Sequence, residues 1–148
     1  MGTYTQILYQ IVFSTKYRHQ TLSGNGRPKL FQYMSGVLRN QRCHPYIING
    51  VEDHVHLVTH LHPSVALADL VKDVKLASSA FIRETGLFPE FDYWQVGYGA
   101  FTYSQSAKED LIRYVADQER HHGVVSFPEE YRGLLEEHGV AFEERFLW

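Results

Sequence analysis

Apolar and polar positions along the chain follow two periods, which mark out strands and helices. Runs rich in β-branched and aromatic residues predict strands at residues 4–14, 44–51, 54–62 and 96–103. Apolar residues at helical spacing predict helices at residues 28–42, 64–84, 106–122 and 128–138. Up to the third helix, the order is β-α-β-β-α-β-α. We therefore expect an α+β fold of the ferredoxin-like or RRM-like βαββαβ type: an antiparallel sheet with an added C-terminal helix that carries Tyr114.

Turn and cap residues indicate where these elements begin and end. The pair Asn49-Gly50 predicts the tight turn of a hairpin. Ser64 is expected to cap the second helix and Gly86 to end it. Ser106, followed three residues later by Glu109, predicts a capping box at the start of the third helix. No internal repeat or linker interrupts these elements, so one domain is expected.

Composition narrows the class of protein. Hydrophobic residues make up 44% of the 148 residues and charged residues 21%, as in an ordinary globular domain. There is no apolar run of ~20 residues and no pattern of a signal peptide, so we expect a cytoplasmic protein with no membrane partner. The single cysteine, Cys43, excludes an internal disulfide and a thiolate zinc site. A net charge of -3 counts against non-specific coating of nucleic acid, but allows an enzyme with a local basic path.

Two histidines share one face of the strand predicted over residues 54–62. Because side chains alternate along a strand, His54 and His56 lie side by side, and the residues between and after them face the core. Two neutral imidazoles at this spacing suit adjacent ligands of one metal ion, although packed or surface histidines show the same pattern. His60 and His62 continue the alternation, but are expected at the frayed strand end, outside any site.

Tyr114 and Gln118 lie one turn apart on the third predicted helix and share a face. A tyrosine in this position is also typical of a core edge. The Gln118 carboxamide, placed beside His54 and His56, would complete a partly open site with three ligands. Such a site suits Mg²⁺ or Mn²⁺ beside substrate oxygens better than a closed zinc site. A phenol one turn away could attack phosphorus, but its pKa of ~10 requires that metal, a base or water help to remove its proton.

These motifs resemble those of the single-tyrosine HUH transposases of bacterial and archaeal insertion sequences and of the related REP-associated tyrosine transposases. His54-Val55-His56 matches the H-hydrophobic-H motif of that family, and Tyr114 to Gln118 matches its Y-x-x-x-Q helix. Three further features agree: Asp53, Thr15-Lys16-Tyr17-Arg18 and Gly97-Tyr98-Gly99-Ala100-Phe101. The resemblance covers residues 4–122. We expect an HUH transposase catalytic domain at residues 1–122, and a C-terminal tail at residues 123–148 that packs on or extends this domain without chemistry of its own.

The resemblance implies a metal-dependent DNA strand transferase that nicks and rejoins single-stranded DNA at element ends. The tyrosine of such enzymes becomes joined to the 5′-phosphate, and the free 3′-OH later attacks another phosphotyrosine. Tyr114 is thereby implied as the nucleophile, and His54, His56 and Gln118 as ligands of Mg²⁺ or Mn²⁺. Hairpin-ended single-stranded DNA is the implied partner, with no small-molecule cofactor. A homodimer is also implied, in which the tyrosine helix of one subunit completes the metal site of that subunit or of its partner.

Basic and aromatic residues supply candidates for DNA contacts. The candidates for the backbone, which a solvated basic surface would equally explain, are Lys16, Arg18, Lys72 and Lys75. The aromatic residues that either stack on bases or pack in a core or dimer interface are Trp94, Tyr98 and Phe101.

Other functions remain open at this point. An RNA-recognition sheet shares the βαββαβ order, but Gly97–Phe101 lacks the basic residue of its signature strand. A domesticated or inactive relative would act as a hairpin-binding nucleic-acid module. His121 and His122 could join His54 and His56 in a hydrolytic or structural zinc site. A phosphoryl hydrolase that uses water would leave no DNA attached to the protein.

Overall fold

Four antiparallel strands form one sheet in the order β2-β3-β1-β4. The computed structural model describes residues 2–147. The strands are β1 (Leu8–Ser14), β2 (Pro45–Gly50), β3 (His54–His60) and β4 (Gly99–Tyr103). The helices are α1 (Arg27–Asn40), α2 (Leu67–Thr85), α3 (Lys108–Ala116), α4 (Gln118–His121) and α5 (Phe127–Glu137). Short 3-10 turns are η1 (Lys16–Arg18), η2 (Gln105–Ala107) and η3 (Glu144–Phe146). This order and topology confirm the predicted α+β fold.

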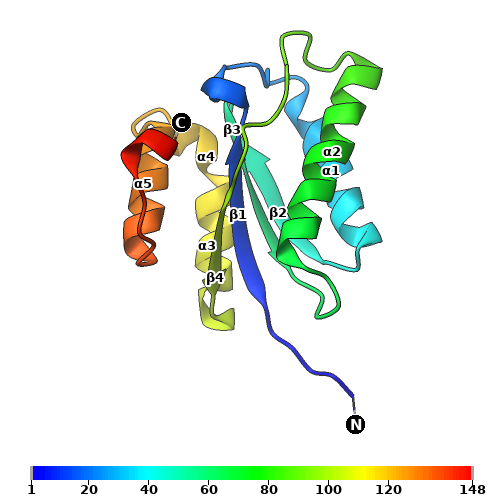
Figure 1. Ribbon diagram of the computed structural model, residues 1–148, viewed down its shortest axis with the longest axis vertical. Coiled ribbons are helices and arrows are strands. Elements are labelled where there is room, and N and C mark those ends of the chain that lie inside the picture. Colours follow the sequence, from blue (N-terminus) through cyan, green and yellow to red (C-terminus); the bar gives the residue numbers. More distant parts are fainter. Residues whose placement is uncertain (1, 148) are drawn as a thin grey trace.

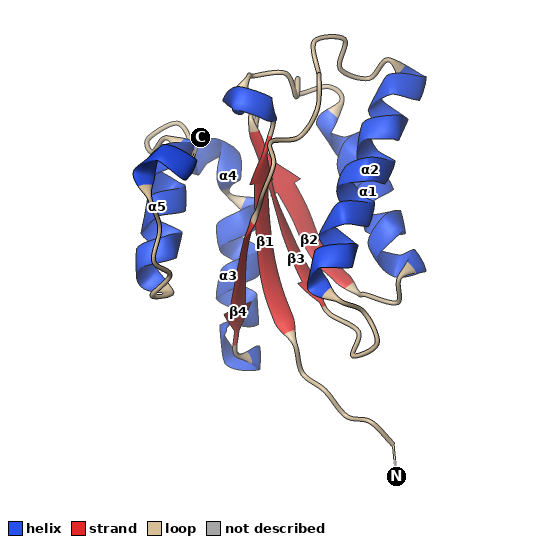
Figure 2. Cartoon of the chain, viewed as in Figure 1, coloured by secondary structure: helices blue, strands red, loops and turns tan. Residues whose placement is uncertain are grey.

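The sheet is the middle of three layers, with α1 and α2 on one face and α3, α4 and α5 on the other (Figures 1 and 2). Alternation along the strands sends Ile11 and Phe13 of β1, and Val55 and Leu57 of β3, into the core beneath α1 and α2. Removal of these apolar side chains from water stabilises the fold by about 25 cal/mol per Å². Within residues 2–147, no helix is long and apolar enough to cross a membrane.

The opposite sheet face is covered by two apolar helix surfaces. One cluster joins Leu111 and Val115 of α3 to Leu8 and Val58 of the sheet. A second cluster joins α5 to β1 and β4 through Val12, Phe101, Phe127, Leu134 and Leu135. Gly99 permits this close packing, since a Cβ there would lie 2.6 Å from Cε1 of Tyr131. α5 is therefore packed on the same sheet as α3.

The hairpin turn lies directly after Gly50, near the predicted position, and Asn49 and Gly50 themselves belong to β2. Gly50 is still paired with Val55, and Asn49 with His56. A Cβ on Gly50 would approach the His54 carbonyl oxygen to 2.2 Å. A glycine is therefore needed at this position because β2 and β3 approach each other too closely for a Cβ.

All four strands are shorter than predicted, and β1 and β4 lose the most residues, at their starts. β1 begins at Leu8, whose partner His60 is the last residue of β3. β4 begins at Gly99, which pairs with Val12. Strand structure is therefore confined to the residues that have a partner strand.

Two predicted helix starts are wrong. α2 has Ala66 as its N-cap, because the Ser64 hydroxyl is engaged with His62 Nδ1 at 2.7 Å. α3 has Ala107 as its N-cap, and the hydroxyl of Ser106 bonds to that of Ser104 instead. The predicted ends are closer to the structure: Gly86, with a φ of 64°, ends α2.

The helix predicted over residues 106–122 is broken at Asp117, which has φ -95° and ψ 18°. Asn49 of β2 supplies a physical reason for the break. Its Nδ2 donates to the carbonyl oxygens of Val115 at 2.9 Å and Ala116 at 3.2 Å. In a continuous helix, those carbonyls would accept from backbone N–H groups four residues later. The chain therefore forms two helices, α3 and α4.

Candidate active site

Two fully buried histidines of β3, His54 and His56, form the centre of the site. The Nδ1–H of His54 donates to the Asp53 carboxylate at 2.7 Å, and the Nδ1–H of His56 donates to Oε1 of Gln10 at 2.7 Å. The amide of Gln10 is oriented by its own bond to the Tyr103 hydroxyl at 2.7 Å. With these Nδ1–H groups fixed, the Nε2 atom of each neutral ring carries a lone pair.

The structure places Tyr114 and Gln118 beside these histidines, although a helix break lies between them. Gln118 is buried, and its Oε1 lies 3.3 Å from Nε2 of His54. The Tyr114 ring stands edge-on to His56, with ring centroids 6.1 Å apart. All four residues expected to carry the chemistry, three ligands and one nucleophile, therefore lie in one group within a single chain.

A carboxylate from the tail occupies the middle of this group. Glu130 of α5 is 5% exposed. Its Oε1 lies 2.9 Å from Nε2 of His122, 3.0 Å from Nε2 of His56 and 3.2 Å from Nε2 of His54. The tail, to which the sequence assigned no chemistry, thus brings a charged group to the candidate site.

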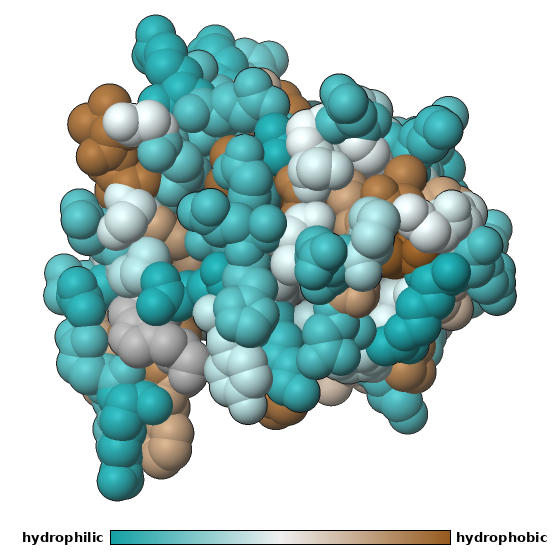
Figure 3. Space-filling view, turned by 90° about the horizontal axis from the view of Figure 1, so that it is seen from above, coloured by the Kyte–Doolittle hydropathy of each residue, from teal (hydrophilic) through white to brown (hydrophobic). Residues whose placement is uncertain are grey.

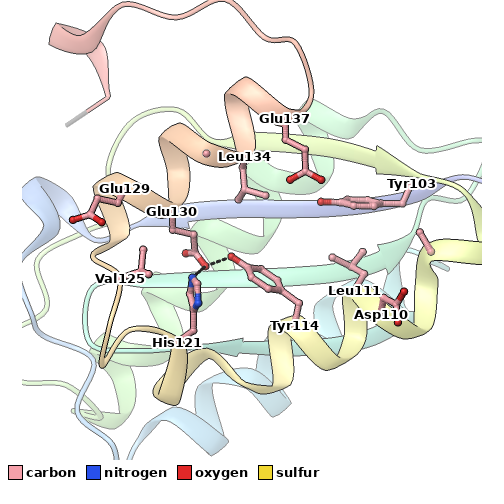
Figure 4. A pocket seen from close by; sticks show the side chains of 12 residues that line it. Tyr103, Asp110, Leu111, Tyr114, His121, Val125, Glu129, Glu130, Leu134 and Glu137 are labelled. Carbon is pink, nitrogen blue, oxygen red and sulfur yellow. Dashed lines mark hydrogen bonds and ion pairs between the residues drawn. The ribbon is translucent and has the colours of Figure 1, made fainter.

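The second oxygen of Glu130 contacts the proposed nucleophile. Oε2 accepts hydrogen bonds from the Tyr114 hydroxyl and from Nε2 of Gln118, the latter at 3.0 Å. Figure 4 shows the Glu130 side chain reaching from α5 toward Tyr114 on α3 and His121 on α4. His121 is a weaker neighbour, with Nε2 at 3.4 Å from Oε2 and 29% of its side chain exposed.

Glu130 was missed because its partners are remote in sequence. One signal was available: Glu130 lies three residues after Phe127 and four before Leu134, inside the apolar stripe of α5. A carboxylate in such a stripe is buried only when it is paired or binds a metal. The sequence pattern alone does not identify the partner, because it does not place α5 over β3.

Electrostatics couple these side chains strongly. Burial alone would raise the pKa of Glu130, but hydrogen bonds from His122, His54 and His56 outweigh it and hold this pKa well below its usual range. Burial opposes protonation of His54, yet its bonds to Asp53 and Glu130 prevail and raise its pKa. Burial lowers the pKa of His56. Burial and the adjacent Glu130 carboxylate raise the pKa of Tyr114 well above its usual value.

The arrangement of donors and acceptors fits a bound cation. When His54 is neutral, its Nε2 lone pair faces Oε1 of Gln118 and Oε1 of Glu130, and three acceptors meet without a proton. Either a proton on His54 or a positive ion among the three removes this repulsion. The ligand atoms of His54, His56, His122 and Glu130 all lie within 4.8 Å of one another. Imidazole nitrogen with carboxylate or carboxamide oxygen is a donor set that divalent metal ions accept.

Comparison with known proteins assigns the chain to a family. The model of the family described as "Transposase IS200 like" matches residues 3–118. The chain belongs to this family. The transposase is 26% identical over 124 residues to the ISDra2 transposase TnpA of Deinococcus radiodurans, a match that covers 79% of this chain and 87% of the relative.

Solved structures show the same fold. A Deinococcus radiodurans transposase matches with a TM-score of 0.64 and 23% identity, over 80% of this transposase and 95% of that chain. A REP-associated tyrosine transposase bound to a REP hairpin matches with a TM-score of 0.58 and 16% identity, over 84% and 76% of the two chains. His122 and Glu130 lie beyond the part of the transposase that the family model matches.

A cavity of about 530 Å³ opens beside Tyr114, Glu130 and His121. Asp110 and Glu137 also line it (Figure 4). The carboxylates of its lining favour the entry of a cation.

The four basic candidates for DNA contact lie in different settings. Lys16 forms an ion pair with Asp92 at 3.5 Å, whereas Lys72 is exposed on α2. Arg18 follows Lys16 in η1, beyond the end of β1 where Ser14 pairs with His54. The molecular surface at this end is mostly hydrophilic, with scattered apolar patches (Figure 3).

Lys75 is held by a loop. Its Nζ donates to the carbonyl oxygens of Gln95 at 2.8 Å and Gly97 at 2.6 Å. Burial lowers its pKa to about 8. A contact between Lys75 and DNA would require these bonds to break.

The aromatic and histidine candidates outside the site also divide by burial. Trp94 and Phe101 are 1% and 3% exposed and pack in the core, whereas Tyr98 is 39% exposed. His60 ends β3, and His62 bonds to Ser64 beyond it. Of the three aromatic side chains, therefore, only Tyr98 is accessible for base stacking.

Proposed function

We propose that this transposase nicks single-stranded DNA at element ends and rejoins it through a 5′-phosphotyrosine on Tyr114. In this proposal His54, His56 and Gln118 hold Mg²⁺ or Mn²⁺. One observation carries the proposal: the Tyr114 hydroxyl, the Gln118 amide and the Nε2 atoms of both histidines converge on one buried carboxylate. A group bound there would contact the nucleophile and the ligand candidates together.

In the proposed step, Oη of Tyr114 bonds to phosphorus as the bond from phosphorus to the 3′ oxygen breaks. The phenolic proton passes to solvent, and the released 3′ oxygen takes up a proton to become a hydroxyl. Because the pKa of Tyr114 is raised, the phenol needs a base, water or a bound ion to help remove its proton as it attacks. A bound divalent ion supplies polarisation of the phosphate and stabilises its developing charge.

The substrate that we propose is single-stranded DNA with hairpins near the element ends, and the assembly is a homodimer. A neighbour of the same fold was solved with a REP hairpin, which supports hairpin DNA as the partner. Tyr114 lies beside the histidines of its own chain. We therefore propose that one subunit supplies both the nucleophile and the metal ligands of a site. The catalytic domain is residues 1–122, extended by residues 123–148; Met1 and Trp148 lie outside the described residues.

Cleavage of a labelled hairpin-ended single strand, with Mg²⁺, Mn²⁺ or a chelator, tests the proposal. Gln118→Ala is expected to lower the metal-dependent rate ~10-fold or more, because it removes a ligand. His121→Ala should change the rate less, since His121 is partly exposed and farther from Glu130. The reverse ranking would favour a zinc site built on His121.

A second candidate is a relative that binds hairpins without cutting them. The observation that favours it is the bond between Tyr114 and the buried Glu130, which ties up the nucleophile. Tyr114→Phe separates the two functions, because it removes the attacking oxygen and leaves DNA contacts intact. Under the proposed function, the wild-type protein nicks and Tyr114→Phe binds the hairpin without nicking. If wild type and variant both bind and neither nicks, the binding module is the better description.

A further inference from the structure

Glu130 and His122 have the geometry of metal ligands. Oε1 of Glu130 lies 2.9 to 3.2 Å from the Nε2 atoms of His122, His56 and His54. Two ligands about 2.1 Å from one ion, and at right angles to each other, lie about 3.0 Å apart. Oε1 of Glu130 thus lies at about the separation from each imidazole that a common ion would impose, and all four ligand atoms lie within 4.8 Å of one another.

The tail holds Glu130 rigidly in this position. Phe127, one turn earlier on α5, stacks on the His54 ring with centroids 4.0 Å apart and an interplanar angle of 18°. Leu134, one turn later, packs with Val12 and Phe101 in the apolar cluster below α5. The carboxylate between them is buried, so it does not reach this position as a freely moving surface side chain.

The two β3 histidines are oriented as ligands usually are. A ligating imidazole characteristically donates its other N–H to a carboxylate or carbonyl, and Asp53 and Gln10 accept these bonds here. Their Nε2 atoms face Glu130. A buried pair of a carboxylate and a histidinium would require a proton on Nε2, whereas a cation satisfies both lone pairs and the carboxylate together.

We propose that Glu130 and His122 bind the same divalent ion as His54 and His56, so that the tail completes the metal site with a carboxylate and a third imidazole. This inference rests on the divalent ion of the proposed function. Three imidazoles and one carboxylate form a nitrogen-rich set, which favours Mn²⁺ and other transition ions over Mg²⁺. Gln118 keeps the ligand role that it has in the proposed function: its Oε1 lies 3.3 Å from Nε2 of His54, while its amide donates to Oε2 of Glu130.

Mn²⁺ binding to the full-length protein, followed by EPR at one fixed pH, tests this set without any activity assay. Glu130→Gln is expected to weaken Mn²⁺ affinity ~10-fold or more, and His122→Ala similarly. Glu129→Gln is the matched control, since Glu129 is exposed and absent from the ligand cluster. It should leave the affinity within about twofold of wild type.

A second measurement needs no variant and so does not depend on how the variants fold. In wild-type protein labelled with ¹⁵N-histidine, pulsed EPR of bound Mn²⁺ should detect three coupled imidazole nitrogens. Two couplings, or an unchanged affinity in Glu130→Gln, would overturn the four-ligand set. If wild type binds Mn²⁺ and His54→Ala does not, the metal site of the proposed function survives that result. If wild type binds no divalent ion, the metal site of the proposed function fails as well.

Discussion

The hydroxyl of Tyr114 donates a hydrogen bond to the carboxylate of Glu130, and this bond joins α3 to α5 over the two buried histidines of β3. The nucleophile candidate and the tail are therefore coupled. Any event that draws the Glu130 carboxylate toward a metal ion, or removes it, also changes the surroundings of the phenol.

Metal binding should release protons and weaken at low pH. The pKa of His54 is raised above its ordinary value, so at pH values below this pKa an ion must displace a proton from the metal-free protein. Affinity should fall as the pH drops through the His54 pKa. The raised pKa also means that protonated His54 stabilises the folded protein. This contribution to the free energy of unfolding is fully present below pH ~6.5 and is lost as the pH rises through the pKa of His54 in the folded protein.

Calorimetry in two buffers with different ionisation enthalpies measures the protons released on Mn²⁺ binding. Asp53→Asn is the control, because it removes the carboxylate that helps to raise the His54 pKa. The variant should release fewer protons at the same pH. An equal apparent enthalpy in both buffers for the wild-type protein would contradict a protonated His54.

Gln10→Met should weaken Mn²⁺ affinity while the fold persists. Gln10 lies fully buried beside His56 and accepts its Nδ1–H, so it orients the Nε2 lone pair toward the site. Loss of such a supporting bond reduces metal affinity by ~10-fold to ~100-fold in other sites. Gln6→Met makes the same change at an exposed position and should have no effect. Equal affinities of the two variants would show that Gln10 does not orient the ligand.

Gly99→Ala should destabilise the protein by about 1–3 kcal/mol, because the new Cβ would lie 2.6 Å from a ring carbon of Tyr131 and push α5 outward. Gly36→Ala in α1 is the matched control, since a Cβ there meets nothing within 4 Å. It should stabilise the protein by about 0.5–1 kcal/mol. Urea unfolding of both variants gives the two free energies. A Gly99→Ala protein as stable as wild type would mean that α5 is not packed as described.

The chemistry of the sheet face could be predicted from the sequence, since it depends on local periodicity. Alternation placed His54 and His56 on one face and Val55 on the other, and the four-residue spacing brought Tyr114 and Gln118 to one side. The helix break at Asp117 could not be predicted, because its cause is the side chain of Asn49 on another element. Glu130 was hidden for the same reason: its three histidine partners come from β3 and from the segment after α4.

Lys16→Gln, Arg18→Gln and Lys72→Gln should each weaken binding of single-stranded DNA if these residues contact phosphates. Each loss should reduce the salt dependence of log K by about 0.7, because one fewer counterion is released from the strand. Lys75→Gln should have a smaller effect, since its ammonium is bonded to loop carbonyls. Titration by fluorescence anisotropy at several salt concentrations measures these slopes. An unchanged slope in all three variants would mean that DNA follows another path.

The proposed function requires that Tyr114 become covalently joined to DNA. Wild-type protein is incubated with Mn²⁺ and single-stranded DNA that carries a hairpin and a label 3′ to the cleavage point, and is then run on a denaturing gel. The account predicts a labelled adduct that migrates with the protein, requires the ion and is absent for Tyr114→Phe. An adduct that persists in Tyr114→Phe, or cleavage by wild type that leaves all labelled DNA free of protein, would contradict it.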